Sequence, residues 1–342
     1  MRFGPVPVAD SVGLISAHAV RAGGAVLRKG SRIGAEEVRR LAEAGIAEVV
    51  VAAPEPGDVG EDEAARTIAA SVAGEGIELA PPFTGRANLH AAAAGVLVLD
   101  GGAIAAVNGV DEAVTLATLA PFKPVVAGEM VGTVKIIPYA IPGDVLRRAR
   151  EAVPRPAVAV APYRLRRVAV VSTLLPGLKP SVVDKTLRVL GERLAPAGAA
   201  LAAETRVPHR AESVAAALRE AVAAPADLVV VFGASAIADR RDVIPAGLSA
   251  AGGRVEHLGM PVDPGNLLLL GRLGEVPVIG APGCARSPKE NGFDWVLHRL
   301  LAGIPVGRAD LVGMGVGGLL MEIVSRPQPR EGGAPAEAED GA

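Results

Sequence analysis

The second half of the chain alternates short apolar runs with stretches in which apolar residues recur at helical spacing. Leu187, Leu190 and Leu194 repeat three to four residues apart, as the buried face of a helix requires. Predicted strands cover residues 166–173, 200–207, 228–232, 254–258 and 277–280, and predicted helices cover residues 181–194, 211–223, 242–251 and 293–301. Because strands alternate with helices and the third strand is apolar throughout, the pattern predicts an α/β fold with a three-layer, doubly wound, mostly parallel sheet.

The first half of the chain has a less regular pattern. Predicted helices cover residues 35–44, begin at Glu61, and extend from an Asp111 cap through Leu119. These elements indicate a mixed α+β domain, whose topology the pattern leaves open. Predicted strands of this domain cover residues 46–51, 95–99 and 132–137.

A proline-rich connector separates the two halves. Residues 151–163 read EAVPRPAVAVAPY, with three prolines and little periodicity. We therefore predict a mixed α+β N-terminal domain at residues 1–162 and an α/β domain at residues 163–326. Residues 327–342 lack the apolar side chains whose burial offsets ordering entropy, so we predict a disordered tail there.

Composition and charge narrow the class of protein. A length of 342 residues suits two domains, and 50% hydrophobic with 2% aromatic residues indicates cores of small aliphatic side chains. The formal net charge of −2 provides no broad positive field, so nucleic acid is not an expected partner. The longest apolar region, residues 91–107, is interrupted by Asp100 and glycines, and the start has no targeting pattern. We expect a cytoplasmic protein without a membrane partner.

The cysteine and histidine content argues against a metal site built by the protein. Cys284 is the single cysteine, which excludes an internal disulfide and a thiolate zinc cluster. The five histidines are scattered, and no two stand at ligand spacing on one helix. We therefore predict no metal-ligating residues of this kind.

The loop after the apolar strand 228–232 is the first candidate binding loop. Ligands of open α/β sheets lie beyond the carboxyl ends of strands, where helix N-termini present free amide donors. Gly233 and Ala234 allow close backbone approach, Ser235 supplies a hydroxyl, and Asp239 and Asp242 stand at the next helix start. The alternative is that these polar residues only form turns and helix caps.

Two later loops also combine turn-forming and polar residues. MPVDPGN at residues 260–266 is the second candidate, with a simple turn as its alternative. GAPGCARSPKENG at residues 280–292 is the third, and it contains many special residues for a connector. Its cysteine is either a nucleophile near a helix start or a buried inert thiol. The predicted ligand contacts in these loops are Pro264, Gly265, Asn266, Pro282, Gly283, Cys284 and Arg286.

Several motifs within residues 166–304 resemble the MoaB/Mog-type domain family, which binds molybdopterin in molybdenum cofactor biosynthesis. A strand is followed by GAS and by RRDVIP at residues 240–245, and DPGN at 263–266 and APG at 281–283 come later. The RRDVIP helix start is similar to that of the adenylyltransferase branch. This resemblance implies that Asp242 binds the ligand. The N-terminal half loosely resembles the molybdenumtransferase branch.

Departures from the family pattern concern the groups that transfer chemistry needs. Asp263 and Asn266 stand where the molybdenumtransferase pattern has lysines, so cations expected to hold molybdate are missing. STLLPGLKP, which includes the predicted ligand contact Thr173, replaces an acidic stretch, and the nearest acid is Asp184. Loop amides remain while charged groups change, which favours binding over catalysis. Asp242 and Asp184 are the candidate catalytic residues, and an active enzyme would hold Mg²⁺ on one of them.

The resemblance implies a molybdopterin-binding protein, with the ligand bare or nucleotide-linked. Related chains carry a nucleotidyltransferase domain, so the expected partner is a separate nucleotidyltransferase. The first alternative is an active molybdopterin adenylyl- or molybdenumtransferase, and the second is a non-catalytic assembly protein with a degenerate site. A homo-oligomer is also expected from the resemblance.

Overall fold

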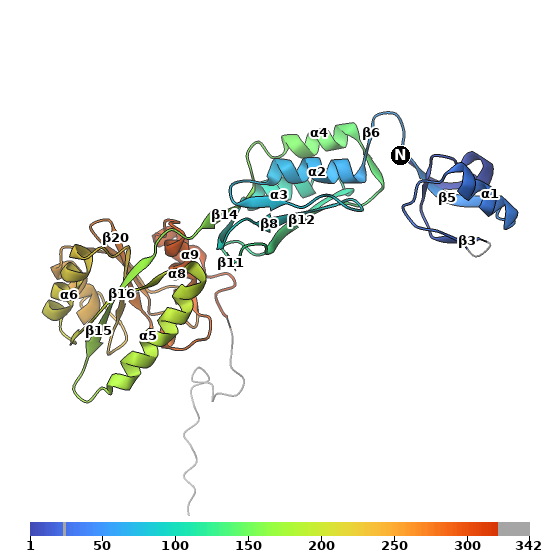
Figure 1. Cartoon of the computed structure of the whole chain (residues 1–342). Coiled ribbons are helices and arrows are strands. Elements are labelled where there is room, and N and C mark those ends of the chain that lie inside the picture. Colours follow the sequence, from blue (N-terminus) through green and yellow to red (C-terminus); the bar gives the residue numbers. More distant parts are fainter. Residues whose placement is uncertain (23–24, 321–342) are drawn as a thin grey trace, which may run out of the picture. The chain divides into compact units, whose positions relative to one another are not determined.

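The computed structural model describes residues 1–22 and 25–320, which form two compact units that meet in sequence between Pro162 and Tyr163 (Figure 1). The predicted tail at residues 327–342 lies outside the described residues. No helix in the described part of the chain is long and apolar enough to cross a membrane.

The first unit contains two separate cores. In the first core, β5 (Glu48–Ala53) pairs antiparallel with β1 (Arg2–Pro7) and β2 (Ile15–Ser16), and α1 (Ala35–Glu43) contributes the buried Leu41. Strands β3 (Val20–Ala22) and β4 (Ala25–Leu27) form a short hairpin, which lies between β2 and α1 in the sequence.

The second core lies between a four-stranded antiparallel sheet of order β10-β12-β8-β7 and the helices that cover one of its faces. Figure 1 shows three helices on the same side of this sheet, and all three contribute buried side chains to one core. The sheet consists of β7 (Ile77–Leu79), β8 (Arg86–Ala91), β10 (Val114–Thr118) and β12 (Met130–Ile136), and the helices are α2 (Glu61–Val72), α3 (Gly101–Asn108) and α4 (Gly143–Glu151). Smaller sheets are formed by β9 (Gly95–Leu99) with β11 (Pro124–Val125) and β14 (Val158–Pro162), and by β6 (Asp58–Gly60) with β13 (Ala140–Pro142).

One predicted helix of this unit is wrong. The segment from Asp111 to Leu119 contains strand β10, in which Val114 and Leu116 are buried while Thr115 and Ala117 are exposed. This alternation has the period of a strand. The capping signal of Asp111 is real but local, because its carboxylate accepts the N–H of Ala113 at 3.0 Å in a turn before the strand.

The second unit is built on a six-stranded sheet of order β16-β15-β17-β20-β19-β18. Its first four strands are parallel, whereas β19 pairs antiparallel with β20, and β18 pairs antiparallel with β19. The strands are β15 (Arg167–Leu174), β16 (Ala200–Pro208), β17 (Leu228–Phe232), β18 (Arg254–Leu258), β19 (Leu269–Leu273) and β20 (Val276–Ala281), and the helices are α5 (Pro180–Leu194), α6 (Ala211–Ala223), α7 (Val243–Ala250), α8 (Gly292–Leu301) and α9 (Arg308–Gly313).

The sheet is therefore mixed, with its parallel part confined to one side. Strand β19 was not predicted: no element was assigned to the apolar residues that follow the MPVDPGN turn. A two-residue turn at Gly274 and Glu275 joins β19 to β20, and so short a connection permits only antiparallel pairing.

Helices cover both faces of this sheet. On β17, Val229 and Val231 belong to the core formed with α6 and α7. Phe232 points the other way and contacts Phe293 of α8, with ring centroids 6.5 Å apart. Because successive side chains of a strand alternate between faces, α8 lies opposite α6 and α7. This two-sided cover explains why β17 is apolar at every position.

Candidate functional site

The loops after β15, β17 and β20 meet at the carboxyl ends of the parallel strands. Gly233, directly after β17, lies in a crowded place: an added Cβ would stand 2.6 Å from the carbonyl oxygen of Ser235 and 2.7 Å from Ile244. Only glycine permits this tight path without displacing backbone. Gly233 is thus required by the packing of its own loop, and close approach of a ligand to this backbone stays a prediction.

A single peptide group at this position is held at both ends. The carbonyl oxygen of Gly233 accepts a hydrogen bond from the Arg286 guanidinium at 2.8 Å. The N–H of Ala234, which belongs to the same peptide group, donates to Oγ1 of Thr173 at 2.7 Å. The structure thus brings together four predicted contact residues from three segments of the chain, namely the end of strand β15 and the loops after β17 and β20. These bonds fix the path of the β17 loop.

His209 joins this cluster, although the sequence analysis did not select it. The residue follows β16, and its backbone N–H donates to the carbonyl of Leu174 at 2.9 Å. Its Nδ1 lies 2.8 Å from Oγ1 of Thr173, and its Nε2 lies 2.9 Å from Oγ of the exposed Ser235. The usable signal was its place at the carboxyl end of a predicted strand, where a histidine is brought close to neighbouring strand ends.

Arg286 places a positive charge on the other side of the pinned peptide. Its guanidinium lies 5.3 Å from the ring centroid of Phe232 and donates to Oγ1 of Thr186 at 2.9 Å. Burial lowers the pKa of this half-buried group. The contacts that offset this cost of burial are the neutral oxygens of Thr186 and Gly233 and the ring face of Phe232.

The two aspartates of the β17 loop shape the backbone. Asp242 is the N-cap of α7: one carboxylate oxygen accepts the N–H of Val243 at 2.8 Å, and the other accepts that of Ala238 at 3.1 Å. The carboxylate of Asp239 accepts a hydrogen bond from the guanidinium of Arg241 at 2.7 Å and another from the backbone N–H of Arg241. These two bonds lower the pKa of this carboxyl. The turn and cap alternative therefore describes the contacts of both residues, and ligand binding by them stays a prediction.

The second candidate catalytic acid, Asp184, lies on α5. Its carboxylate is exposed and forms an ion pair with Arg206 of β16 at 2.7 Å. Among the residues that the structure describes, no group of three or more His, Cys, Asp or Glu side chains could hold a metal ion.

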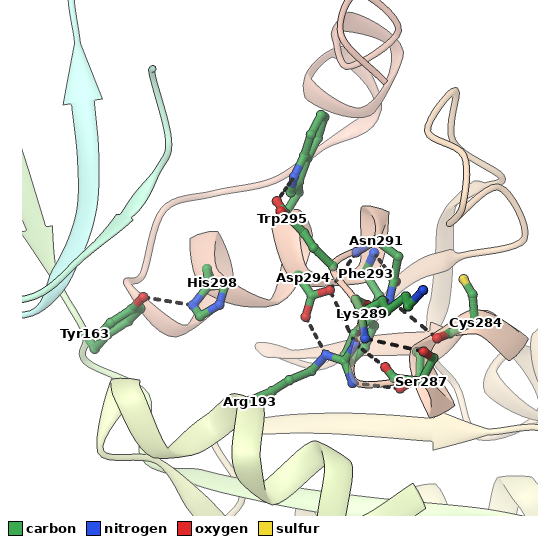
Figure 2. Close-up of polar contacts among 12 residues, drawn as sticks. Tyr163, Arg193, Cys284, Ser287, Lys289, Asn291, Phe293, Asp294, Trp295 and His298 are labelled. Carbon is green, nitrogen blue, oxygen red and sulfur yellow. Dashed lines mark hydrogen bonds and ion pairs between the residues drawn. The ribbon is translucent and has the colours of Figure 1, made fainter. Parts of the chain in front are cut away.

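The loop between β20 and α8 is anchored by one buried arginine (Figure 2). Arg193 of α5 forms an ion pair with Asp294 and donates to the carbonyls of Ala285 at 2.9 Å and Ser287 at 2.7 Å. Asn291 caps α8 by accepting the N–H of Phe293 at 3.1 Å. Arg193 was not predicted, because its partners lie about a hundred positions away in the sequence.

The remaining predicted contacts lie in this loop and in the turn at residues 264–266. Gly265 packs against the start of α8, where an added Cβ would stand 2.7 Å from the nitrogen of Gly292, and that nitrogen donates to the carbonyl of Pro264 at 2.9 Å. Cys284 is half-buried, and burial raises the pKa of its thiol, which disfavours the reactive thiolate. The other members of the predicted set are the exposed Asn266 and Gly283 and the buried Pro282.

Comparisons with known proteins assign two segments of the chain. Residues 168–303 match a family model described as "Probable molybdopterin binding domain", and residues 5–53 match a domain of unknown function, DUF8806. No curated protein sequence matches the chain.

Three solved structures are similar to part of this chain, and each match covers 41% of its length. A molybdenum cofactor biosynthesis protein B is 18% identical, with 95% of that chain covered and a TM-score of 0.31. A protein CinA with unknown function from Thermoplasma acidophilum is 17% identical, with 99% covered and a TM-score of 0.32. The molybdopterin biosynthesis enzyme MoaB from Thermus thermophilus is 18% identical, with 99% covered and a TM-score of 0.30.

Proposed function

We propose that residues 168–303, which match the model of a probable molybdopterin binding domain, bind molybdopterin at the carboxyl ends of β15, β17 and β20. The ligand is proposed to be bare or nucleotide-linked molybdopterin, in the service of a nucleotidyltransferase partner. The observation that carries the proposal is the pinned peptide of Gly233 and Ala234. The exposed Ser235 follows this peptide, and the peptide's carbonyl oxygen binds the half-buried cation of Arg286.

The donors at this place fit the phosphate of a pterin cofactor. A phosphate oxygen accepts hydrogen bonds from hydroxyl groups and backbone amides, and it is stabilised by a nearby positive charge. Ser235 supplies an exposed hydroxyl, and Arg286 supplies a charge whose bound partners, Thr186 and Gly233, are both neutral. An anionic ligand would compensate this charge, whereas a neutral ligand would leave its desolvation cost unchanged.

Binding without transfer chemistry agrees best with the contacts of the two candidate catalytic acids. An active transferase would use Asp242 or Asp184 to hold Mg²⁺. Both oxygens of Asp242 accept backbone N–H groups, and Asp184 pairs with Arg206. Mg²⁺ would have to compete with these partners for the lone pairs of either carboxylate. We therefore propose a binding domain that presents the cofactor to another protein.

A titration of the full-length chain with molybdopterin under anaerobic conditions tests this proposal. We expect saturable binding, and we expect Ser235→Ala to weaken it about 10- to 100-fold, the usual effect of losing a hydrogen bond to a charged group. Ser249→Ala is the matched control, because Ser249 is exposed on α7 and donates to the carbonyl of Pro245 at 3.0 Å. Wild-type protein that binds neither bare nor nucleotide-linked molybdopterin would refute the proposed function.

A further inference from the structure

The hydrogen bonds around His209 have a direction that the backbone determines. The N–H of Ala234 can only donate, so Oγ1 of Thr173 must accept this bond. Thr173 is buried, at 1% exposure, and its hydroxyl proton must find an acceptor inside the protein. Its other partner in the structure is Nδ1 of His209, at 2.8 Å. Thr173 therefore donates to Nδ1.

This direction determines the tautomer of a neutral His209. When Nδ1 accepts, the ring proton lies on Nε2, which then donates to Oγ of Ser235 at 2.9 Å. The opposite tautomer would place a proton on Nδ1 facing Thr173 and remove the acceptor for its buried hydroxyl. An unsatisfied buried donor is unfavourable, so the Nε2–H tautomer is the stable one.

The direction of these hydrogen bonds also determines what the exposed hydroxyl of Ser235 can bind. Because the oxygen of Ser235 accepts a hydrogen bond from the Nε2–H group, its own hydroxyl proton is free to point outward to another acceptor. Each donor in the chain from Ala234 to Ser235 also polarises the next one, which strengthens the last hydroxyl as a donor. The same direction makes His209 a poor base for Ser235, since Nε2 carries a proton and has no lone pair to receive one.

We propose that His209 is a positioning residue, which holds the Ser235 hydroxyl as a donor to the phosphate of the bound ligand. This inference rests on the proposed function, because it names the ligand group that Ser235 contacts. It assigns to the pair a role in anion recognition rather than in nucleophilic attack. No covalent step at Ser235 is part of the proposal.

Two amide substitutions separate the two contacts of the ring. The side-chain amide of glutamine in His209→Gln reaches about as far as Nε2 and can donate to Ser235. The amide of asparagine in His209→Asn reaches only about as far as Nδ1 and can contact Thr173. Because the backbone N–H of residue 209 is bound to Leu174, both variants keep the same attachment to β15.

The binding experiment compares these variants with molybdopterin and with its dephosphorylated form. We expect His209→Asn to weaken binding of the phosphorylated form about 10- to 100-fold and His209→Gln to restore most of the affinity. Binding of the dephosphorylated form should be nearly equal in all three proteins. Equal loss in both variants, or equal loss with both ligands, would overturn the role of His209 while leaving the proposed function standing.

A measurement on the protein without ligand tests the tautomer directly. Nitrogen-15 NMR of the imidazoles should show His209 with a protonated Nε2 and a bare Nδ1, and the His209→Gln variant identifies its signals. Thr173→Val should abolish the preference for this tautomer. A protonated Nδ1 in the neutral wild-type ring would refute the inference even if molybdopterin binds. Absence of molybdopterin binding with the expected tautomer would refute the phosphate contact and the proposed function together.

Discussion

Replacement of Arg193 by methionine tests what holds the loop before α8. The Arg193 side chain is 8% exposed and binds the Asp294 carboxylate together with loop carbonyls, including that of Ser287. Methionine fills part of the same volume but leaves these acceptors without their donor. Removal of one partner from a buried ion pair costs about 3–5 kcal/mol. We expect about 3 kcal/mol, because Asp294 also accepts the N–H of Asn291 at 2.8 Å.

The assay is thermal and urea unfolding followed by the fluorescence of Trp295, the only tryptophan of the chain, which lies in α8 just after this loop. A loss of about 3 kcal/mol should lower the Tm of the domain by about 6–12 °C. Arg188→Met is the matched control on the same helix, since Arg188 is exposed and forms an ion pair with the exposed Glu192. Equal Tm values for the two variants would refute the anchoring role of Arg193.

Three further predictions concern single positions in the second unit. Ser172→Ala should raise the free energy of unfolding by about 1 kcal/mol in urea titrations, because the Ser172 hydroxyl is buried and has no hydrogen-bond partner among the described residues. A decrease would show that the hydroxyl is satisfied. Gly265→Ala should lower the Tm, because its φ of 142° and its closeness to Gly292 both oppose a side chain, and an unchanged Tm would contradict this packing. The Arg167 side chain is the main cause that lowers the pKa of Asp227 to about 2, so the stability that this carboxylate contributes is present above pH 3.8 and is lost as the pH falls through about 2. Asp227→Asn should remove this part of the pH dependence in acid unfolding curves, and an unchanged acid limb would count against it.

Local periodicity predicted the elements of the second unit well, and it failed where pairing partners decide the outcome. The predicted helix at residues 181–194 corresponds to α5, and the predicted strand at 228–232 has the bounds of β17. Both depend on burial patterns within a few turns or residues of sequence. The segment of β10 was predicted as a helix because its capping signal is local, whereas its strand form depends on pairing with β12.

The residues of the candidate site also fall into two groups: those that the local sequence predicted and those that only the structure revealed. Sequence motifs predicted that Gly233, Ala234 and Ser235 form a candidate binding loop, because a glycine directly after a buried strand indicates a tight backbone path. His209 and Arg193 carried no such signal, because each acts through partners on other strands or loops. Their roles arise from long-range hydrogen bonds, which one sequence does not display.

The sequence by itself determined the order and kind of most elements, the two units, and the resemblance of residues 166–304 to a molybdopterin-binding domain, because these depend on local pattern and on motif. The tertiary structure decided that the sheet is mixed, that Asp242 caps a helix, and that Thr173, His209 and Ser235 form one directed hydrogen-bond chain. Strand direction and side-chain partners are set by which surfaces pack together, and that choice belongs to the whole core rather than to any segment.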